Sequence, residues 1–260
     1  TYGPPDTDLE SYYIETEEGI TAAAARNIGI QQANVCYIAF LDDDDEWLPE
    51  KTSRQVQRLQ STPESVRATF CKNKKISPDS SVKTVNSPKE WDDWVVPLIW
   101  GSLIGTFSCL MVESNASENI GHLDPEFHLM EDQDYCLRLA QRYDFSLIDE
   151  ALVHKHVDGH QQLSGDYKLR KQSISRFQKK HENVVKSYSL TKKQNAFFHY
   201  SLGNSAINEG NYWLANSHYL RAVFYLPSRI QFYKYFVATL GGRYSYDIAR
   251  RIAHSDTNMI

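Results

Sequence analysis

The run from Asp42 to Glu46 places five adjacent carboxylates directly after an apolar segment. Neighbouring carboxylates repel one another unless a cation compensates their charge. Oxygen ligands favour Mg²⁺ or Mn²⁺, and these ions commonly bridge protein carboxylates to substrate phosphates. A calcium loop of the EF-hand type fits badly, because the sixth position is Trp47 instead of glycine and the twelfth is Ser53 instead of glutamate. The run therefore favours a divalent metal site.

A solvated turn that caps the next helix is the alternative interpretation of these carboxylates. The helix dipole stabilises each charge by ~0.3–1 kcal/mol, which accounts for one or two carboxylates but hardly for five.

Two further groups of residues could take part in chemistry. An acidic cluster stands where a helix is expected to begin, and there the dipole alone would favour it; it consists of Glu131, Asp132 and Asp134. Three histidines at close spacing could hold zinc or could simply be polar residues of a surface loop; these are His154, His156 and His160.

These residues need a scaffold, and the pattern up to residue 150 alternates strands with helices. Predicted strands cover residues 12–14, 37–41, 67–76, 106–112 and 145–148. Helices are predicted over residues 20–33, from Pro49 to about Gln60, and over residues 132–141, and the end of a further helix is predicted within residues 88–100. Residues 77–87 are predicted to form a polar loop. The alternation predicts an α/β fold with a mostly parallel sheet and ligands at the carboxyl ends of its strands.

The pattern becomes helical from Tyr167 onward. Residues 199–227 have the spacing of one tetratricopeptide-like helical hairpin, carried by Leu202, Gly203, Ala215, Tyr219, Ala222 and Pro227. Stacked repeats generally need at least three copies, so we expect a helical cap on the α/β body in preference to an independent peptide-binding module. The predicted division is an α/β domain over residues 1–165 and a helical region over residues 166–260.

Length and composition limit the class of protein. The 260 residues are 41% hydrophobic and 12% aromatic, which excludes disorder and small disulfide scaffolds. Residues 1–159 carry 13 basic and 28 acidic side chains, whereas residues 160–260 carry 15 and 5, so an acidic body precedes a basic tail.

The cellular setting is predicted from the cysteines and the apolar segments. All four cysteines lie in apolar runs, which favours buried free thiols in a reducing cytoplasm; they are Cys36, Cys71, Cys109 and Cys136. No signal peptide is visible at the start of the sequence. The 19 uncharged residues from Trp94 to Val112 are broken by Pro97 and Gly101, and therefore favour a soluble segment over a membrane span.

Two blocks of the sequence resemble the family-two glycosyltransferases. Residues 25–30 (ARNIGI) and 37–51 (YIAFLDDDDEWLPEK) are similar to that family's ARNxGI…YIxFLDxDDxWxPxK signature. Residues 120–125 (IGHLDP), the EDQD run at 131–134 and Arg138 resemble its GxFDE…EDxDxxxR block. The resemblance covers residues 20 to about 165 and implies a GT-A fold that transfers a sugar from a nucleotide diphosphate donor with inversion.

The resemblance also implies roles for individual residues. Asp42 and Asp44 take the place of the DxD motif, with Asp44 on a Mn²⁺ or Mg²⁺ ion and Asp42 on the ribose or sugar. Glu131 and Asp132 match the catalytic pair, in which Asp132 is the general base. His156 is the histidine expected to join the metal, with His154 and His160 as alternates. The remaining donor-binding candidates are Arg26, Asn27 and Arg138.

One departure from the family pattern concerns the N-terminus. Family members usually begin with an apolar strand, a PTYN turn and a second strand that hold the nucleotide base. Asp6-Thr7-Asp8 only vaguely resembles the end of that second strand. We therefore expect about 40 residues of the pattern to be missing, with weak donor binding or poor solubility of this chain as the consequence.

The expected partners are a nucleotide-sugar donor and a glycan, lipid-linked or protein acceptor, without nucleic acid. The basic segment Tyr167–Lys193 is either a solvated face or a contact to anionic lipid on the inner face of a membrane. Two other functions remain open: a non-catalytic scaffold built on a degenerate transferase body, and a metal-dependent phosphohydrolase that uses the aspartates.

Overall fold

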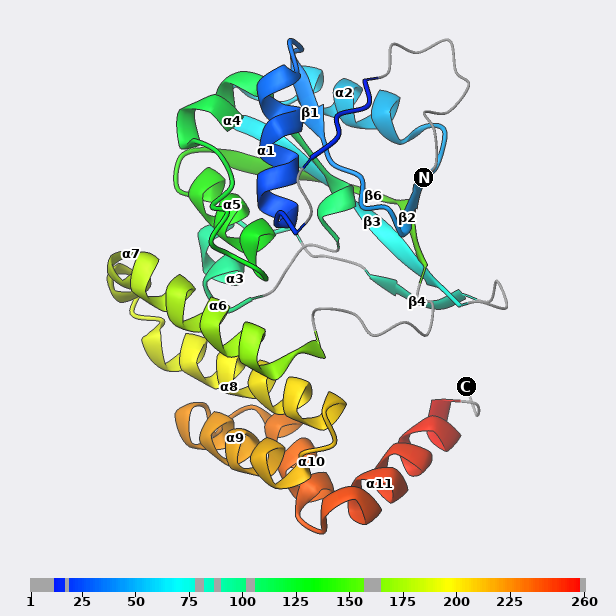
Figure 1. Cartoon of the computed structure of the whole chain (residues 1–260), viewed down its shortest axis with the longest axis vertical. Coiled ribbons are helices and arrows are strands. Elements are labelled where there is room, and N and C mark those ends of the chain that lie inside the picture. The colour runs from blue at the N-terminus through cyan, green and yellow to red at the C-terminus, as the bar shows by residue number, and fades with distance from the viewer. Residues whose placement is uncertain are drawn as a thin grey trace.

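The computed structural model describes residues 12–16, 19–77, 82–86, 90–101, 106–156 and 165–257. An α/β layer forms one end of the molecule, and the helices from α6 onward extend from it to the other end (Figure 1). The α/β class and the helical C-terminal region predicted from the sequence are confirmed. Asp6-Thr7-Asp8 and His160 lie outside the described residues.

A six-stranded sheet forms the centre of the α/β layer, in the order β1-β5-β3-β6-β2 with β4 paired to β3. Its strands are β1 (Tyr37–Ala39), β2 (Asp45–Trp47), β3 (Val66–Ile76), β4 (Val82–Asn86), β5 (Leu110–Glu113) and β6 (Asp144–His156). Among these strands β3 and β6 pair in parallel, and the other pairs are antiparallel. The prediction of a mostly parallel sheet is therefore wrong in strand direction.

Connection length explains part of this difference. Only residues 77–81 join β3 to β4, and a parallel crossover needs a dozen or more residues, so the two strands form an antiparallel pair. The loop predicted at residues 77–87 therefore contains a strand. The strand predicted at residues 12–14 is absent, since Tyr12 and Tyr13 are exposed and lie outside the sheet.

The helices around the sheet are α1 (Ala22–Gln32), α2 (Lys51–Ser61), α3 (Val95–Ile99), α4 (Ser114–Ile120) and α5 (Glu131–Ala140). Thr21 caps α1, because its hydroxyl accepts a hydrogen bond from the Ala24 amide at 3.2 Å. A 3₁₀ turn, Phe107–Cys109, precedes β5 and takes up the first half of the strand predicted at 106–112. Cys36 is exposed, against prediction, whereas the other three cysteines are buried free thiols.

Six helices follow the sheet: α6 (Tyr167–Lys180), α7 (Glu182–Ser187), α8 (Thr191–Asn208), α9 (Tyr212–Tyr225), α10 (Ile230–Thr239) and α11 (Gly242–Thr257). Helices α8 and α9 form the predicted hairpin. A Cβ atom on Gly203 would approach the Tyr219 ring to 2.6 Å, so the close contact between these helices requires glycine at this position.

The apolar core of the sheet continues into these helices. Ile174, Phe177, Val185, Phe198 and Leu202 belong to the same buried cluster as the strands. Helices α6 to α8 are thus packed directly onto the α/β layer. In the described part of the chain, no helix has both the length and the hydropathy to cross a bilayer.

Candidate active site

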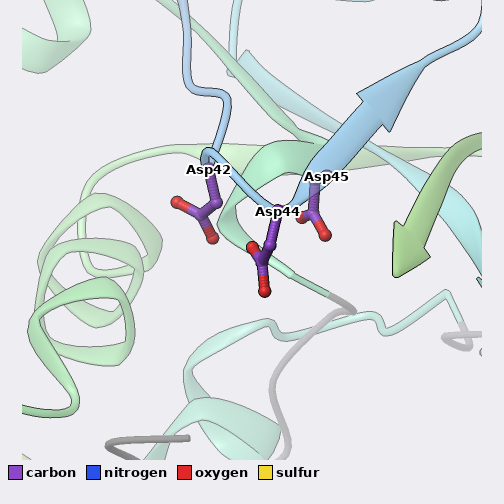
Figure 2. Close-up of side chains that lie close together, drawn as sticks. All are labelled: Asp42, Asp44 and Asp45. Carbon is purple, nitrogen blue, oxygen red and sulfur yellow. The ribbon is translucent and has the colours of Figure 1, made fainter. Parts of the chain in front are cut away.

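The aspartate run forms a tight turn between β1 and β2. The Asp45 amide donates a hydrogen bond to the Asp42 carbonyl at 3.1 Å, which closes the turn. Asp42, Asp44 and Asp45 each offer a carboxylate oxygen, and these oxygens lie within 4.8 Å of one another. Figure 2 shows the three side chains projecting from this turn toward the same side. The turn thus gathers three carboxylates at the end of β1.

Two hydroxyl groups hold this turn in place. Ser108 Oγ accepts a hydrogen bond from the Asp42 amide at 3.0 Å, and Thr106 Oγ1 lies 2.9 Å from Asp45 Oδ2 and 3.3 Å from Asp42 Oδ2. The indole of Trp47 donates to the Ser108 carbonyl at 2.9 Å. Sequence reasoning did not identify these supporting residues, although they lie at the start of the predicted strand 106–112.

The charge of Asp45 is only partly compensated, by Lys155 and by hydrogen bonds from Ser108 and Thr106. The Oδ1 atom of Asp45 is buried and has no hydrogen-bond partner within the described residues. Burial raises the pKa of Asp45 above its usual value, and the charge of Asp44 raises it further. An unsatisfied carboxylate oxygen beside two other carboxylates fits a divalent cation, which prefers such oxygen ligands.

The second acidic cluster begins α5. Met130, immediately before the helix, has a left-handed backbone with φ of 71°, a conformation that costs energy for any residue except glycine. Glu131 follows and accepts a hydrogen bond from Arg26 Nη1 at 2.8 Å. Arg26 Nη2 donates to Asp42 Oδ1 at 2.5 Å. A single guanidinium on α1 therefore joins the two acidic clusters.

Asp132 is a carboxylate whose pKa lies closer to neutrality than that of an ordinary aspartate. Burial, with the adjacent charge of Glu131, raises the pKa of Asp132 to about 6, although the charges of Arg26 and Arg170 oppose the shift. Its Oδ1 atom accepts a hydrogen bond from the Gln133 amide at 2.7 Å. A carboxylate with this pKa can accept a proton at neutral pH.

Asp134, two residues further along α5, is completely buried, and its pKa is lowered instead of raised. His181 Nε2 and Lys180 Nζ both lie 2.8 Å from its Oδ1, and Arg138 Nε donates to its Oδ2 at 3.0 Å. Burial alone would raise the pKa of Asp134, but the hydrogen bond from His181 and the nearby cations lower it to about 2. Asp134 is therefore a fully paired carboxylate that ties α5 to the end of α6.

A cavity of about 520 Å³ lies against both acidic clusters. The α/β layer contributes Arg26, Asp42, Thr106, Glu131 and Asp132 to its lining. The opposite wall comes from the C-terminal helices, with Arg170 on α6 and Phe197, Tyr200, Ser201 and Asn204 on α8. Nothing in the sequence indicated that the helical region would line this cavity.

Asn27 and Arg138, two of the predicted donor-binding residues, bind backbone groups of the segment before α5 instead of lining the cavity. The side-chain Nδ2 of Asn27 donates a hydrogen bond to the Leu123 carbonyl at 2.8 Å, and its Oδ1 accepts one from the Leu123 backbone amide at 2.9 Å. Arg138 donates to the carbonyls of residues 120, 121 and 122 as well as to Asp134. The described lining of the cavity includes neither side chain. Both hold the segment before α5 against its neighbours.

The histidines lie beside the aspartate turn but not among its carboxylates. The His156 amide donates to the Asp44 carbonyl at 3.3 Å, so the end of β6 contacts the turn. The side chains of His154 and His156 each approach Glu46 Oε2 to 3.4 Å. Within the described residues, the three-carboxylate group contains no histidine.

The chain is similar to known proteins over part of its length. Residues 7–105 match the model of glycosyl transferase family 2. An uncharacterized glycosyltransferase of Haemophilus influenzae is 27% identical over 143 residues, which cover 54% of this chain and 48% of that protein. The amylovoran biosynthesis glycosyltransferase AmsB of Erwinia amylovora is 24% identical over 189 residues, 70% of this chain and 57% of AmsB.

A putative teichuronic acid biosynthesis glycosyltransferase of Bacillus subtilis, TuaG, is 38% identical over 56 residues, 22% of this chain and 21% of TuaG. The chain thus spans about half the length of the first two relatives and less of the third. The family match over residues 7–105 and these relatives identify the chain as similar to the glycosyltransferases of family 2.

Proposed function

We propose that this protein transfers a sugar, with inversion, from a nucleotide diphosphate donor to an acceptor hydroxyl. The observation that carries the proposal is the bridge that Arg26 makes between Asp42 and Glu131. Asp42 of the three-carboxylate group and Asp132, whose pKa is raised, line the same cavity. An in-line displacement needs these two functions on opposite sides of one carbon atom.

The aspartate turn would hold the donor through a divalent ion, Mn²⁺ or Mg²⁺. Asp44 is the proposed principal ligand, Asp45 supplies the unsatisfied oxygen, and Asp42 faces the ribose or sugar. When bound, such an ion neutralises the charge that develops on the departing diphosphate. His156 would reach this ion only if its side chain left Glu46.

Asp132 would act as the general base. As the acceptor oxygen bonds to the anomeric carbon, its proton passes to the Asp132 carboxylate and the diphosphate leaves with the electrons of the glycosidic bond. A pKa of about 6 leaves this carboxylate largely ionised at pH 7 and still basic enough to take a proton. Glu131 would position Arg26 and thereby the donor side of the cavity.

The acceptor would lie against the wall formed by α6 and α8. Aromatic and hydroxyl side chains, such as Tyr200 and Ser201, line that wall and suit a sugar or another polyol. A glycan acceptor, free or lipid-linked, also agrees with the amylovoran and teichuronic acid biosynthesis named for two relatives. In this proposal the division at residue 165 separates a donor-binding domain from a helical region that completes the acceptor side of the cavity. The enzyme would work in the cytoplasm.

Donor binding with and without Mn²⁺ tests the proposal. A thermal-shift screen of nucleotide sugars identifies the donor, since a ligand that binds the native state raises stability. Calorimetry then compares the parent with Asp44→Asn, which should lose Mn²⁺-dependent binding and keep its fold, because the substitution relieves carboxylate repulsion. Asp43→Asn is the matched control, since Asp43 is exposed and stands outside the three-carboxylate group.

Three outcomes would contradict the proposal. Donor binding by Asp44→Asn as tight as that of the parent would exclude the metal assignment. Absence of Mn²⁺-dependent donor binding in the parent would favour a non-catalytic scaffold. Release of free sugar from the donor at the same rate with and without acceptors would favour a phosphohydrolase-type reaction over transfer.

A further inference from the structure

The helices farthest from the sheet expose large apolar side chains in stripes. On α9, Trp213 is 70% exposed and Phe224 is 80% exposed, with Leu220 between them at 50%. The spacing of seven and four residues places all three on one face of the helix. The opposite face of α9 is buried against its neighbours through Ala215 and Ala222. The three exposed residues therefore do not take part in the packing that holds the hairpin together.

The next two helices repeat this arrangement. Ile230, Tyr233 and Val237 are exposed on one face of α10, and Tyr244 and Ile248 are exposed on α11. Figure 1 shows α9, α10 and α11 together at the end of the molecule away from the sheet. We call the exposed apolar residues of these three helices the α9–α11 surface. Large apolar side chains that are exposed on neighbouring helices are typical of an interaction site.

The charges around this surface are almost all positive. Residues 211–248 contain Arg221, Arg229, Lys234 and Arg243, and Asp247 is their single acidic residue. All four cationic residues are exposed. Aromatic and aliphatic side chains with a cationic rim are typical of helices that lie in the interface of an anionic bilayer.

Several cations of the other basic segment, Tyr167–Lys193, are already paired with residues of the α/β layer. On α6, Arg176 pairs with Asp124 at 3.0 Å, and Lys180 pairs with Asp124 at 3.0 Å and with Asp134 at 2.8 Å. Lys193, at the start of α8, covers the Trp100 ring at 3.3 Å. The segment Tyr167–Lys193, in which a lipid contact was predicted from the sequence, thus directs several of its cations toward the α/β layer.

We propose that the α9–α11 surface docks on an anionic phospholipid bilayer, with its aromatic side chains at the headgroup level. A second copy of the chain is the less suitable occupant. A two-fold dimer would place this surface against its own copy, and like charges would then face one another. An anionic bilayer instead offers opposite charge and an apolar interior to the same residues. The docking does not depend on the sugar-transfer proposal.

Sedimentation with lipid vesicles tests the docking. The full chain should bind vesicles that contain phosphatidylglycerol and phosphatidylcholine, and should bind pure phosphatidylcholine vesicles much more weakly. Trp213 is a built-in probe, because its exposed indole should shift its fluorescence to shorter wavelength on entering the bilayer interface. High salt should weaken the binding, since surface charges are screened.

Two pairs of substitutions separate the apolar from the electrostatic contribution. Trp213→Ser with Phe224→Ser should weaken vesicle binding at least about tenfold. Lys234→Ser with Arg243→Ser should weaken binding to the anionic vesicles by about fivefold per cation and leave the weak phosphatidylcholine binding unchanged. The matched control is Tyr13→Ser with Val82→Ser, which removes exposed apolar side chains elsewhere and should bind as the parent does.

Thermal unfolding of each variant verifies that the fold is retained, because all of these side chains are exposed. Absence of parent binding to anionic vesicles would overturn the proposal. Parental binding by Trp213→Ser with Phe224→Ser, or by Lys234→Ser with Arg243→Ser, would also overturn it. A concentration-dependent dimer that Trp213→Ser with Phe224→Ser abolishes would assign the surface to a second copy instead. Donor binding with Mn²⁺ should be the same in every variant, so the two proposals can fail separately.

Discussion

The aspartate turn and the start of α5 use the same residue type in opposite ways. In the turn, Asp42, Asp44 and Asp45 are crowded, and a buried oxygen of Asp45 has no hydrogen-bond partner within the described residues. On α5, two carboxylates only two residues apart have pKa values of about 6 for Asp132 and about 2 for Asp134. The chain supplies three cationic partners for Asp134, whereas the turn has Arg26 on Asp42 and only the charge of Lys155 near Asp45.

Removal of the proposed base should have the largest effect. Asp132→Asn should lower transfer ~10²- to 10⁴-fold, because a positioned general base is lost, and should leave donor affinity unchanged. Steady-state rates together with donor calorimetry check both parts. The exposed Asp144→Asn is the control and should transfer at the parental rate. Equal turnover of Asp132→Asn and the parent would show that Asp132 is only a carboxylate of the helix start.

Removal of the paired carboxylate should instead reduce stability. Asp134→Asn leaves His181, Lys180 and Arg138 without their shared anion, and breaking a buried pair costs ~3–5 kcal/mol of unfolding free energy. Because the pKa of Asp134 is lowered to about 2, its contribution is complete above the unfolded value near 4 and is lost as pH falls toward 2. Denaturant unfolding at pH 7 and at pH 3 measures this. A variant as stable as the parent at pH 7 would contradict it.

The sequence predicted the elements whose determinants are local. The helix that begins at Glu131 and the hairpin of α8 and α9 follow from residues that are close together in the sequence. Strand direction was predicted wrongly, because it depends on which strands become neighbours after residues far apart in the chain have packed.

The same limit applies to the site. Spacing placed Asp132 and Asp134 in one motif, but their partners lie on α1, α6 and the following loop, so their different pKa values could not be predicted. The Arg26 bridge and the cavity wall on α8 also need the tertiary structure. Arg26 itself was a candidate from the resemblance, but nothing in the sequence indicated that it would contact both clusters.

A smaller effect is expected from the hydroxyl that supports the aspartate turn. Thr106→Val removes the hydrogen bond to Asp45 and nearly preserves the shape of the side chain. Mn²⁺ affinity should fall about tenfold, which is typical when a group that orients a metal ligand is lost. Calorimetry with Mn²⁺ measures it, with Thr84→Val on β4 as the control. Unchanged Mn²⁺ affinity would show that the backbone alone fixes the turn.

The smallest expected effect measures how far the charge of Arg170 opposes the raised pKa of Asp132. Transfer by the parent should decline as pH falls through about 6, because the base is active only when deprotonated. The charge of Arg170 lowers the pKa of Asp132 against burial, so Arg170→Gln should move this decline upward by less than about one pH unit. Rates measured at saturating donor from pH 5 to 8 give both curves, and Arg170→Lys, which keeps the charge, should restore the parental one. A decline that stays at the same pH in Arg170→Gln would assign the shift to burial and Glu131 alone, whereas a decline that moves downward would exclude Asp132 as the titrating group.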